Sequence, residues 1–468
     1  MDTRKTQPEP QTKTAYDADT PQALIDFMST GWAEAPIKVS HLPNAAQYKR
    51  RRDDLSQAYP GAYIVVPSGT EQVRANDTNF RFRTASNFAY LVGPGEPDCM
   101  LVLEPRAGGG HDSLLFVLPH NRGTSAFFTD RVHGELWVGR HRGVDESQIY
   151  YGVDRCRPAG EIRAYLDDLR IRGARVLHAE EDAELATHLS EMRLIKDETE
   201  IAELRTCNEI TKRGFEDVIA LMGRTSSERE IEAAFWRRAR IEANDVGYLT
   251  IAASGEHACT LHWTHNHGTV RSGDLLLLDA GVEADSLYTA DVTRTLPISG
   301  KFTEAQRTVY DLVYKAQQAA FAQVKPGNDF LAPNNAAMEV LAQGLIDLGI
   351  LKCSLAEALD PQKMFYKRYT LHGVSHMLGI DVHDCAKART ENYRYGKLRE
   401  GMALTVEPGL YFQPDDETVP AHLRGIGVRI EDDVVVTANG CDNLTAIFPS
   451  EASEVEAWIG SIATKSSK

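Results

Sequence analysis

The chain has 468 residues, and its 51 Lys and Arg against 67 Asp and Glu give a formal net charge of −16. At about 150 residues per domain, this length predicts two or three domains. The acidic charge argues against a nucleic-acid partner, because phosphate binding requires clustered basic side chains. The content of 42% hydrophobic and 25% charged residues is typical of a globular protein and disfavours disordered, collagen-like and coiled-coil architectures.

The cysteines and the N-terminus indicate a reducing compartment. Seven cysteines are dispersed without a Cys-x-x-Cys pair, which predicts reduced thiols rather than a disulfide framework or a zinc knuckle. The first 20 residues are polar, so no signal peptide is expected. No run of about 18 apolar residues occurs, so no membrane-spanning helix is expected either. We therefore expect a cytoplasmic protein without a membrane partner.

The N-terminal half is predicted to be a polar tail over residues 1–34 followed by a domain over residues 35–190. A helical pattern covers residues 44–59. The Gly-rich residues 108–110 are predicted to form a loop and not a phosphate cradle, because no helix start follows them. Short apolar runs bounded by Gly or Pro indicate strands at residues 63–66, 88–92, 100–103 and 114–118.

A second domain is predicted over residues 191–462. Asp197 and Glu200 have the chemistry of a capping box and predict a helix start, and Ser227 opens a second helix. Two helices and two strands follow in that order, and the same order recurs after Thr303. An internal duplication explains this recurrence, and chance repetition of a general α+β order is the alternative. The four predicted strands cover residues 275–279, 288–296, 403–412 and 427–436.

Each of these two strand pairs carries two acids, Asp279 and Asp291 in the first and Glu407 and Glu431 in the second. Carboxylates are rarely buried unless they are paired or bind a metal, and four of them in apolar strands would repel one another. Divalent cations such as Mn²⁺, Mg²⁺ or Zn²⁺ suit carboxylate ligands. A metal site is therefore favoured over four separate helix caps or ion pairs.

A histidine ligand is expected from residues 371–384, where His372, His376 and His383 lie among glycines. A surface loop with hydrogen-bonded histidines is the alternative. A second histidine cluster is less specific, and His262 within it is expected to be partly buried between two apolar residues. The other three histidines of that cluster are expected to be solvated: His257, His265 and His267.

Strand alternation places Arg429 on the same face as Glu431, with Val428 and Ile430 on the opposite face. An arginine in an apolar strand needs a nearby anion. We therefore expect Arg429 to hold a metal-binding carboxylate in place by bidentate hydrogen bonds. An ordinary ion pair is the alternative.

These motifs resemble the metallopeptidases of the pita-bread fold, and specifically the proline-specific aminopeptidases (aminopeptidase P, or Xaa-Pro aminopeptidase). Residues 74–93 resemble the creatinase-type N-terminal domain of that family. The resemblance implies a creatinase-type α/β domain followed by an α+β pita-bread domain with an internal pseudo-duplication. It rests on Asp279 in LLLLDAG, Asp291 in YTADVTRT, His376 in HGVSHMLGIDVHD, Glu407 in LTVEPGLY and Glu431 in GIGVRIEDD.

The family implies two adjacent divalent metal ions per chain, usually Mn²⁺. Asp279 and Asp291 would hold one ion, and His376 and Glu407 would hold the other. Asp291 and Glu431 would bridge both ions. A hydroxide between the ions would attack the N-terminal Xaa-Pro bond, with Glu407 as the proton carrier. The loop between Asp279 and Asp291 is one residue longer than the commonest family spacing, which a turn can absorb.

The resemblance also implies residues that surround the substrate. His262, His372 and His383 resemble histidines that contact the substrate and stabilise the tetrahedral intermediate, and Tyr411 would line the same site. Trp137 resembles a tryptophan contributed by a neighbouring subunit. The family is commonly a homodimer or homotetramer, so we expect one of these assemblies.

The expected substrates are peptides with proline at the second position. A prolidase, which cleaves Xaa-Pro dipeptides with the same five ligands, is the main alternative. Ser375 and the DVHD sequence that ends at Asp384 favour the aminopeptidase. A non-catalytic pita-bread binding protein is a remote alternative, because all five ligands are present.

Overall fold

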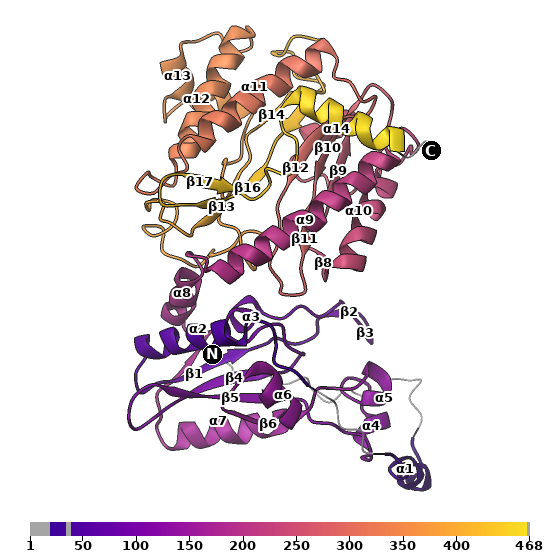
Figure 1. Cartoon of the computed structure of the whole chain (residues 1–468), viewed down its shortest axis with the longest axis vertical. Helices are drawn as coiled ribbons and strands as arrows, with labels where there is room; N and C mark the ends of the chain where they lie inside the picture. The colour runs from indigo at the N-terminus through magenta and orange to yellow at the C-terminus, as the bar shows by residue number, and fades with distance from the viewer. Residues whose placement is uncertain (1–18, 34–38, 466–468) are drawn as a thin grey trace. The chain divides into compact units, whose positions relative to one another are not determined.

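The computed structural model describes residues 19–33 and 39–465 (Figure 1). By their internal contacts, the described residues fall into two compact units. One unit comprises the described residues up to Lys49 together with Tyr59–Arg83 and Glu96–Val176. The other comprises Arg50–Ala58, Thr84–Gly95 and the chain from Leu177 onward. The units therefore alternate along the sequence, and the boundaries expected at residues 34 and 190 stay predictions.

The first unit is built around a five-stranded sheet with the strand order β6-β5-β4-β1-β7. β4 pairs antiparallel with β1 and β5, whereas β5 and β6 are parallel. α7 packs on this sheet, because its Tyr165 and Leu166 contact the buried side chains of Val102 and Phe116 and their neighbours. The elements, including α2 and β7 at the unit boundaries, are α1 (Gln22–Met28), α2 (Ala45–Ala58), β1 (Tyr63–Pro67), β2 (Val73–Ala75), β3 (Thr78–Asn79), β4 (Met100–Pro105), β5 (His111–Val117), α4 (Ala126–Thr129), α5 (Glu135–Val138), α6 (Val144–Tyr151), β6 (Arg155–Pro158), η1 (Ala159–Glu161), α7 (Ile162–Ile171) and β7 (Val176–His178).

The structure differs from the sequence-based expectations at two places in the N-terminal half. The apolar run 88–92, predicted to be a strand, lies in helix α3 (Ser86–Val92). All five of its side chains are buried, and an apolar run buried on every side has the same pattern in a helix and in a strand. The expected tail contains α1 in its described part, where the ring of Trp32 contacts that of Phe127 at a centroid distance of 5.1 Å. Residues 1–18 lie outside the described residues.

The second unit contains one arrangement twice, as the sequence predicts. α9 packs against α10 and α11 packs against α12, and each helix pair precedes a three-stranded antiparallel sheet (Figure 1). The two sheets have the strand orders β12-β10-β9 and β13-β16-β17. Besides α3, the elements are α8 (Ala183–Met192), α9 (Glu198–Leu221), α10 (Glu228–Glu242), β8 (Asp245–Val246), β9 (Ile251–Ser254), η2 (Gly255–Cys259), β10 (Leu275–Asp279), β11 (Val282–Glu283), β12 (Thr293–Pro297), α11 (Glu304–Phe321), α12 (Ala332–Asp347), α13 (Leu355–Leu359), η3 (Phe365–Arg368), β13 (Ala403–Val406), β14 (Gly409–Tyr411), β15 (Gly427–Arg429), β16 (Asp432–Val436), β17 (Cys441–Asn443) and α14 (Ala452–Lys465).

The first helix of each pair begins with a capping box. At α9 the side chain of Asp197 accepts the backbone N–H of Glu200, whose side chain accepts the backbone N–H of Asp197. Thr303 and Gln306 make the same exchange at the start of α11. These reciprocal bonds satisfy N–H groups that have no partner inside the helix, which confirms the predicted helix starts.

Three of the four predicted strands of this unit are shortened or interrupted, each beside a predicted metal-binding acid. β12 starts two residues after Asp291 instead of before it. β13 and β14 divide the third predicted strand at Glu407, and β15 and β16 divide the fourth at Glu431. β10 matches its prediction and ends on Asp279.

The interruptions arise because backbone groups beside the acids bond outside the strand ladders. The N–H of Asp291 donates to the carboxylate of Asp433 at 3.1 Å. The N–H of Glu431 donates to the carbonyl of Thr293 at 3.0 Å. Pro408 has no N–H to give to a ladder. The acids are therefore placed at gaps in the sheets, where their side chains face one another.

No helix among the described residues has the length and apolar character needed to cross a membrane.

Gly281 offers a test of how tightly this region is packed. A Cβ atom on Gly281 would lie 1.7 Å from the backbone oxygen of Ala290, which cannot move without displacing Asp291. We therefore expect Gly281→Ala to lower the free energy of unfolding by about 3 kcal/mol. Gly440→Ala is the control, because a Cβ there meets nothing within 4 Å. Urea unfolding of both variants checks this, and equal stability would contradict it.

Candidate metal centre and active site

Three of the predicted acids are placed by neighbouring strands of the second unit. Asp279 lies opposite Thr293 in the register of β10 and β12, and the carbonyl of Thr293 accepts the N–H of Glu431. This backbone bond brings together the two sheets that carry the acids. Asp279, Asp291 and Glu431 are 7%, 5% and 2% exposed, and Glu407 is half-buried.

Asp291, His376 and Glu431 form a group whose potential ligand atoms all lie within 4.8 Å of one another. The Nε2 atom of His376 lies 3.3 Å from Asp291 and 3.5 Å from Glu407. Its Nδ1 atom lies 3.1 Å from the carbonyl of Met377, which leaves Nε2 to face the acids. The structure thus brings four of the five predicted ligands together at one point.

Asp279 is connected to this group through Arg429. The guanidinium of Arg429 donates to Asp279 at 2.5 Å and to the hydroxyl of Thr293 at 3.1 Å. Thr293 in turn donates to Glu431 at 2.7 Å. The expectation that Arg429 holds a site carboxylate is supported, but the geometry is not bidentate. One guanidinium group binds Asp279 directly and reaches Glu431 through a hydroxyl.

Tyr248 and Thr293 are contacts that the sequence analysis did not identify. The hydroxyl of Tyr248 donates to the second oxygen of Asp279 at 2.6 Å, so both oxygens of Asp279 are held. Tyr248 belongs to no motif that would have indicated it. Thr293 sits two residues after Asp291 in YTADVTRT, and strand alternation would have placed it on the same face.

The electrostatics of the group match a site for cations. Burial raises the pKa of Glu407 to about 7 and that of Glu431 well above its ordinary range, and in both cases Asp291 adds to the effect. Burial acts to lower the pKa of His376, but Asp291 and Glu407 raise it to about 9. Without a metal cation, bound protons are what reduces the repulsion among these carboxylates. A donor set of four carboxylates and one imidazole fits hard or borderline divalent ions.

Two of the outer histidines also contact this group. The Nε2 atom of His372 lies 2.8 Å from the hydroxyl of Tyr411, and its Nδ1 atom lies 3.4 Å from Glu407. Burial, together with the charge of Arg429, lowers the pKa of His372 to about 4, so this imidazole is neutral near pH 7. The rings of His383 and His376 meet edge to face at 4.3 Å.

The second histidine cluster differs from its expectation. His262 is exposed rather than partly buried, and its charge acts on the pKa values of both His372 and His383. His257 was expected to be solvated, but it is half-buried because it binds Glu228 and stacks on Trp263. The two neighbours of His262, Leu261 and Trp263, pack against a buried apolar cluster, which leaves the imidazole of His262 outside. The last two members are exposed as expected: His265 and His267.

The loop that carries His376 and His383 is fixed by a buried group of charges that the sequence analysis missed. Asp384 accepts from Arg193 at 3.0 Å and from Lys196 at 3.1 Å, and all three side chains are buried. Although burial acts to raise it, the two cations hold the pKa of Asp384 below its ordinary value. These bonds fix the backbone directly after His383.

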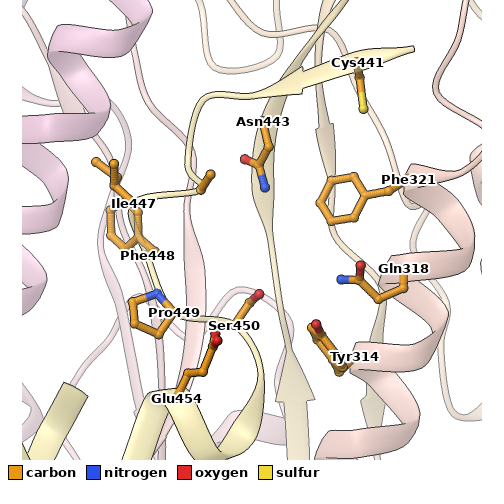
Figure 2. Close-up of a pocket in the computed structure, with 11 residues that line it drawn as sticks. Tyr314, Gln318, Phe321, Cys441, Asn443, Ile447, Phe448, Pro449, Ser450 and Glu454 are labelled. Atoms are coloured by element: carbon orange, nitrogen blue, oxygen red, sulfur yellow. The ribbon is translucent and has the colours of Figure 1, made fainter. Parts of the chain in front are cut away.

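Trp137 belongs to the first unit, whereas the predicted ligands belong to the second. Trp137 is 54% exposed in α5 of the first unit, and its indole donates to the carbonyl of Phe128 at 2.8 Å. Its role beside a neighbouring subunit stays a prediction. A cavity of the second unit has a volume of about 410 Å³. It lies between α11 and residues 441–450, with Gln318 and Phe321 on one side and Pro449 on the other (Figure 2). None of the predicted site residues lines this cavity.

The three-way contact of Arg429 predicts an order of metal affinities. Arg429→Met removes the group that orients Asp279, so the affinity for Mn²⁺ should fall by about 10²-fold. Arg429→Lys keeps the positive charge but cannot donate to all three acceptors of Arg429. Its affinity for Mn²⁺ should therefore lie between those of the wild type and Arg429→Met. Calorimetric titration with Mn²⁺ measures this, with the exposed Arg389→Met as control. Equal affinities of the wild type and Arg429→Met would contradict it.

Known proteins match this chain over nearly its whole length. The family model for metallopeptidase family M24 matches residues 202–438, and that for the aminopeptidase P N-terminal domain matches residues 48–177. Two relatives are Xaa-Pro aminopeptidases 1 and 2 of Streptomyces coelicolor, 46% and 48% identical over 459 residues, which cover 94% of this chain and 92% and 96% of theirs. The solved structure of Escherichia coli aminopeptidase P with the inhibitor Pro-Leu is similar with a TM-score of 0.81 and 33% identity, covering 90% of this chain and 100% of that one. With these matches and the convergent acids and histidine, the chain belongs to metallopeptidase family M24 and has the N-terminal domain of the aminopeptidases P.

Proposed function

We propose that this chain is a metal-dependent Xaa-Pro aminopeptidase, which removes the first residue of peptides whose second residue is proline. The observation that carries the proposal is the convergence of Asp291, His376 and Glu431, with Glu407 beside them. The relatives named Xaa-Pro aminopeptidases match over nearly their full length and favour this activity over a prolidase. A complete set of ligands disfavours a non-catalytic binding protein.

Five residues would hold two divalent ions, with Mn²⁺ as the proposed metal. Asp279 and Asp291 would hold one ion, His376 and Glu407 the other, and Asp291 and Glu431 would be shared. Support comes from the buried position of the acids and from the Nε2 atom of His376, which faces Asp291 and Glu407. When bound, the ions supply Lewis acidity that polarises a carbonyl and makes water nucleophilic near neutral pH.

The other side chains would orient the ligands and manage protons. Arg429 donates to Asp279 and would keep its carboxylate turned toward the site. Neutral His372 donates its Nδ1–H to the carbonyl of Gly373 at 2.8 Å, so its Nε2 atom accepts the hydroxyl of Tyr411 and would hold that hydroxyl beside the substrate. Glu407, which lies 3.4 Å from His372, would pass a proton to the proline nitrogen that leaves.

A proline at the second position presents a distinct chemical problem. The Xaa-Pro bond is a tertiary amide without an N–H, so a peptidase cannot hold that bond through an N–H donor. Selection must instead come from the shape of the pyrrolidine ring and from the free amine of the first residue. A homodimer or homotetramer in the cytoplasm is proposed by resemblance, and the free cysteines of the chain are compatible with that compartment.

The substrate assignment predicts a specific pattern of hydrolysis. The purified chain with Mn²⁺ should release the first residue from Xaa-Pro-Yaa peptides and leave matched Xaa-Ala-Yaa peptides intact. Chelation should abolish the reaction, and added Mn²⁺ should restore it. Amino-acid release is followed by mass spectrometry. Cleavage of Xaa-Pro dipeptides alone would establish the prolidase instead, and no cleavage of any of these peptides would contradict the proposal.

Substitutions at Asp291 and His383 should separate a ligand from a substrate contact. Asp291→Ala removes the shared ligand, so bound metal and activity should both be lost while the fold remains. His383→Ala should keep the metal and lower kcat by about 10²-fold, the usual scale for a proton-transfer or oxyanion group. Metal analysis, circular dichroism and kinetics of both variants test this. Turnover by Asp291→Ala in excess Mn²⁺, or loss of metal from His383→Ala, would refute the assignment.

A further inference from the structure

Glu228 is a fully buried acid at the first position of α10 and accepts four hydrogen bonds. One carboxylate oxygen accepts the backbone N–H of Ser254 and the Nδ1 atom of His257, each at 2.8 Å. The other accepts the indole N–H of Trp263 at 2.8 Å and the backbone N–H of Gly268 at 2.6 Å. A buried carboxylate is costly unless it is satisfied in this way. The N-terminus of a helix further stabilises its charge.

All four donors belong to one segment, residues 254–268, which runs from the end of β9 through η2 to a loop. The segment is folded around the carboxylate. The ring of His257 stacks on Trp263 with centroids 3.9 Å apart. A Cβ atom on Gly268 would lie 2.5 Å from His257 and 2.6 Å from Glu228, so only glycine allows this approach. Glu228 thus defines the shape of the whole segment.

The same segment reaches the proposed active site. Trp263 and Leu261 pack against a buried apolar cluster that includes Tyr411. Tyr411 binds Arg429 and His372. His262 therefore stands between two residues that are anchored in the interior, with its imidazole exposed on the side of the segment that does not pack.

We propose that Glu228 is a positioning residue, which holds residues 254–268 so that His262 faces His372 and His383 and meets the bound peptide. This inference rests on the proposed function, because it takes His262 as a substrate contact. Glu228 acts at a distance, through Trp263 and His257, rather than on the reacting atoms. A residue displaced by about 1 Å can cost roughly 10²-fold in rate, so the anchor matters for catalysis as well as for folding.

Glu228→Gln tests the anchor with little change in size. However its amide turns, the NH₂ group of glutamine would face two of the four N–H donors. We expect kcat/KM for Xaa-Pro-Yaa peptides to fall by about 10²-fold, mainly through kcat, with the bound metal unchanged. Glu232→Gln, one turn further along α10 and outside this network, is the matched control and should behave as the wild type. Wild-type kinetics of Glu228→Gln would overturn the inference.

A double variant separates positioning from a general structural role. If Glu228 acts through His262, then adding Glu228→Gln to His262→Ala should lower kcat/KM by no more than about twofold further. Multiplied losses would show that the two residues act independently and would overturn the inference. If the wild type itself cleaves no Xaa-Pro-Yaa peptide, the proposed function fails, a result distinct from an active wild type that Glu228→Gln does not impair.

A readout that needs no activity follows the hydrogen bond itself. In ¹H–¹⁵N spectra, the indole N–H signal of Trp263, identified by its loss in Trp263→Phe, should move upfield in Glu228→Gln, because a charged acceptor is lost. An unmoved signal would contradict the inference. Should Glu228→Gln fail to fold, Trp263→Phe decides, since it removes one bond and keeps an aromatic ring in the stack. We then expect about a tenfold loss in kcat, and an unaltered kcat would overturn the inference.

Discussion

The mutual repulsion of buried carboxylates is the constraint around which the second unit is organised. Asp279, Asp291 and Glu431 are almost completely enclosed, and Glu407 faces the same imidazole as Asp291. Arg429 is the cation that contacts Asp279, and it supplies one positive charge to a group that holds several negative ones. The rest is met by proton uptake in the metal-free chain, or by divalent ions. This conflict explains why the site is best understood as a metal centre and not as a network of ion pairs.

The strands are interrupted at the site, and buried polar side chains donate hydrogen bonds to the backbone carbonyls at these gaps. Arg294 is buried and donates to the carbonyls of Thr293 and Glu431, at the gap between β15 and β16. Gln317 of α11 donates to the carbonyls of Val406 and Ile430, which flank the two interruptions. Carbonyls at strand gaps would otherwise be buried without partners. Long polar side chains therefore complete the ladders that the acids interrupt.

The place of Asp279 at the end of β10 and the starts of α9 and α11 could be predicted from the sequence because their signals are local. Asp279 ends an apolar strand, Thr303 and Asp197 cap their helices, and such patterns are read within a few residues. The strand interruptions could not be predicted, because they depend on bonds between distant segments such as that from Asp291 to Asp433. The run 88–92 was assigned to a strand because uniform burial gives a helix and a strand the same apolar pattern.

The supporting residues were missed for a related reason. Glu228 looks like an ordinary first-turn acid in the sequence, and its role emerges only when residues 254–268 fold around it. Lys196 and Asp384 are separated by 188 residues yet form a buried pair. The predicted exposures of His257 and His262 are wrong: His257 is half-buried because it binds the distant Glu228, and His262 is exposed. Sequence patterns thus indicate the side chains that converge at the site better than the residues that hold them in place.

The central claim is that two cations occupy the space among the five predicted ligands. Anomalous diffraction from crystals grown with Mn²⁺ tests it directly. We expect two anomalous peaks roughly 3.5–4 Å apart, the separation usual for two-metal hydrolases, enclosed by Asp279, Asp291, His376, Glu407 and Glu431. The absence of peaks among these side chains, with the acids still buried, would contradict it.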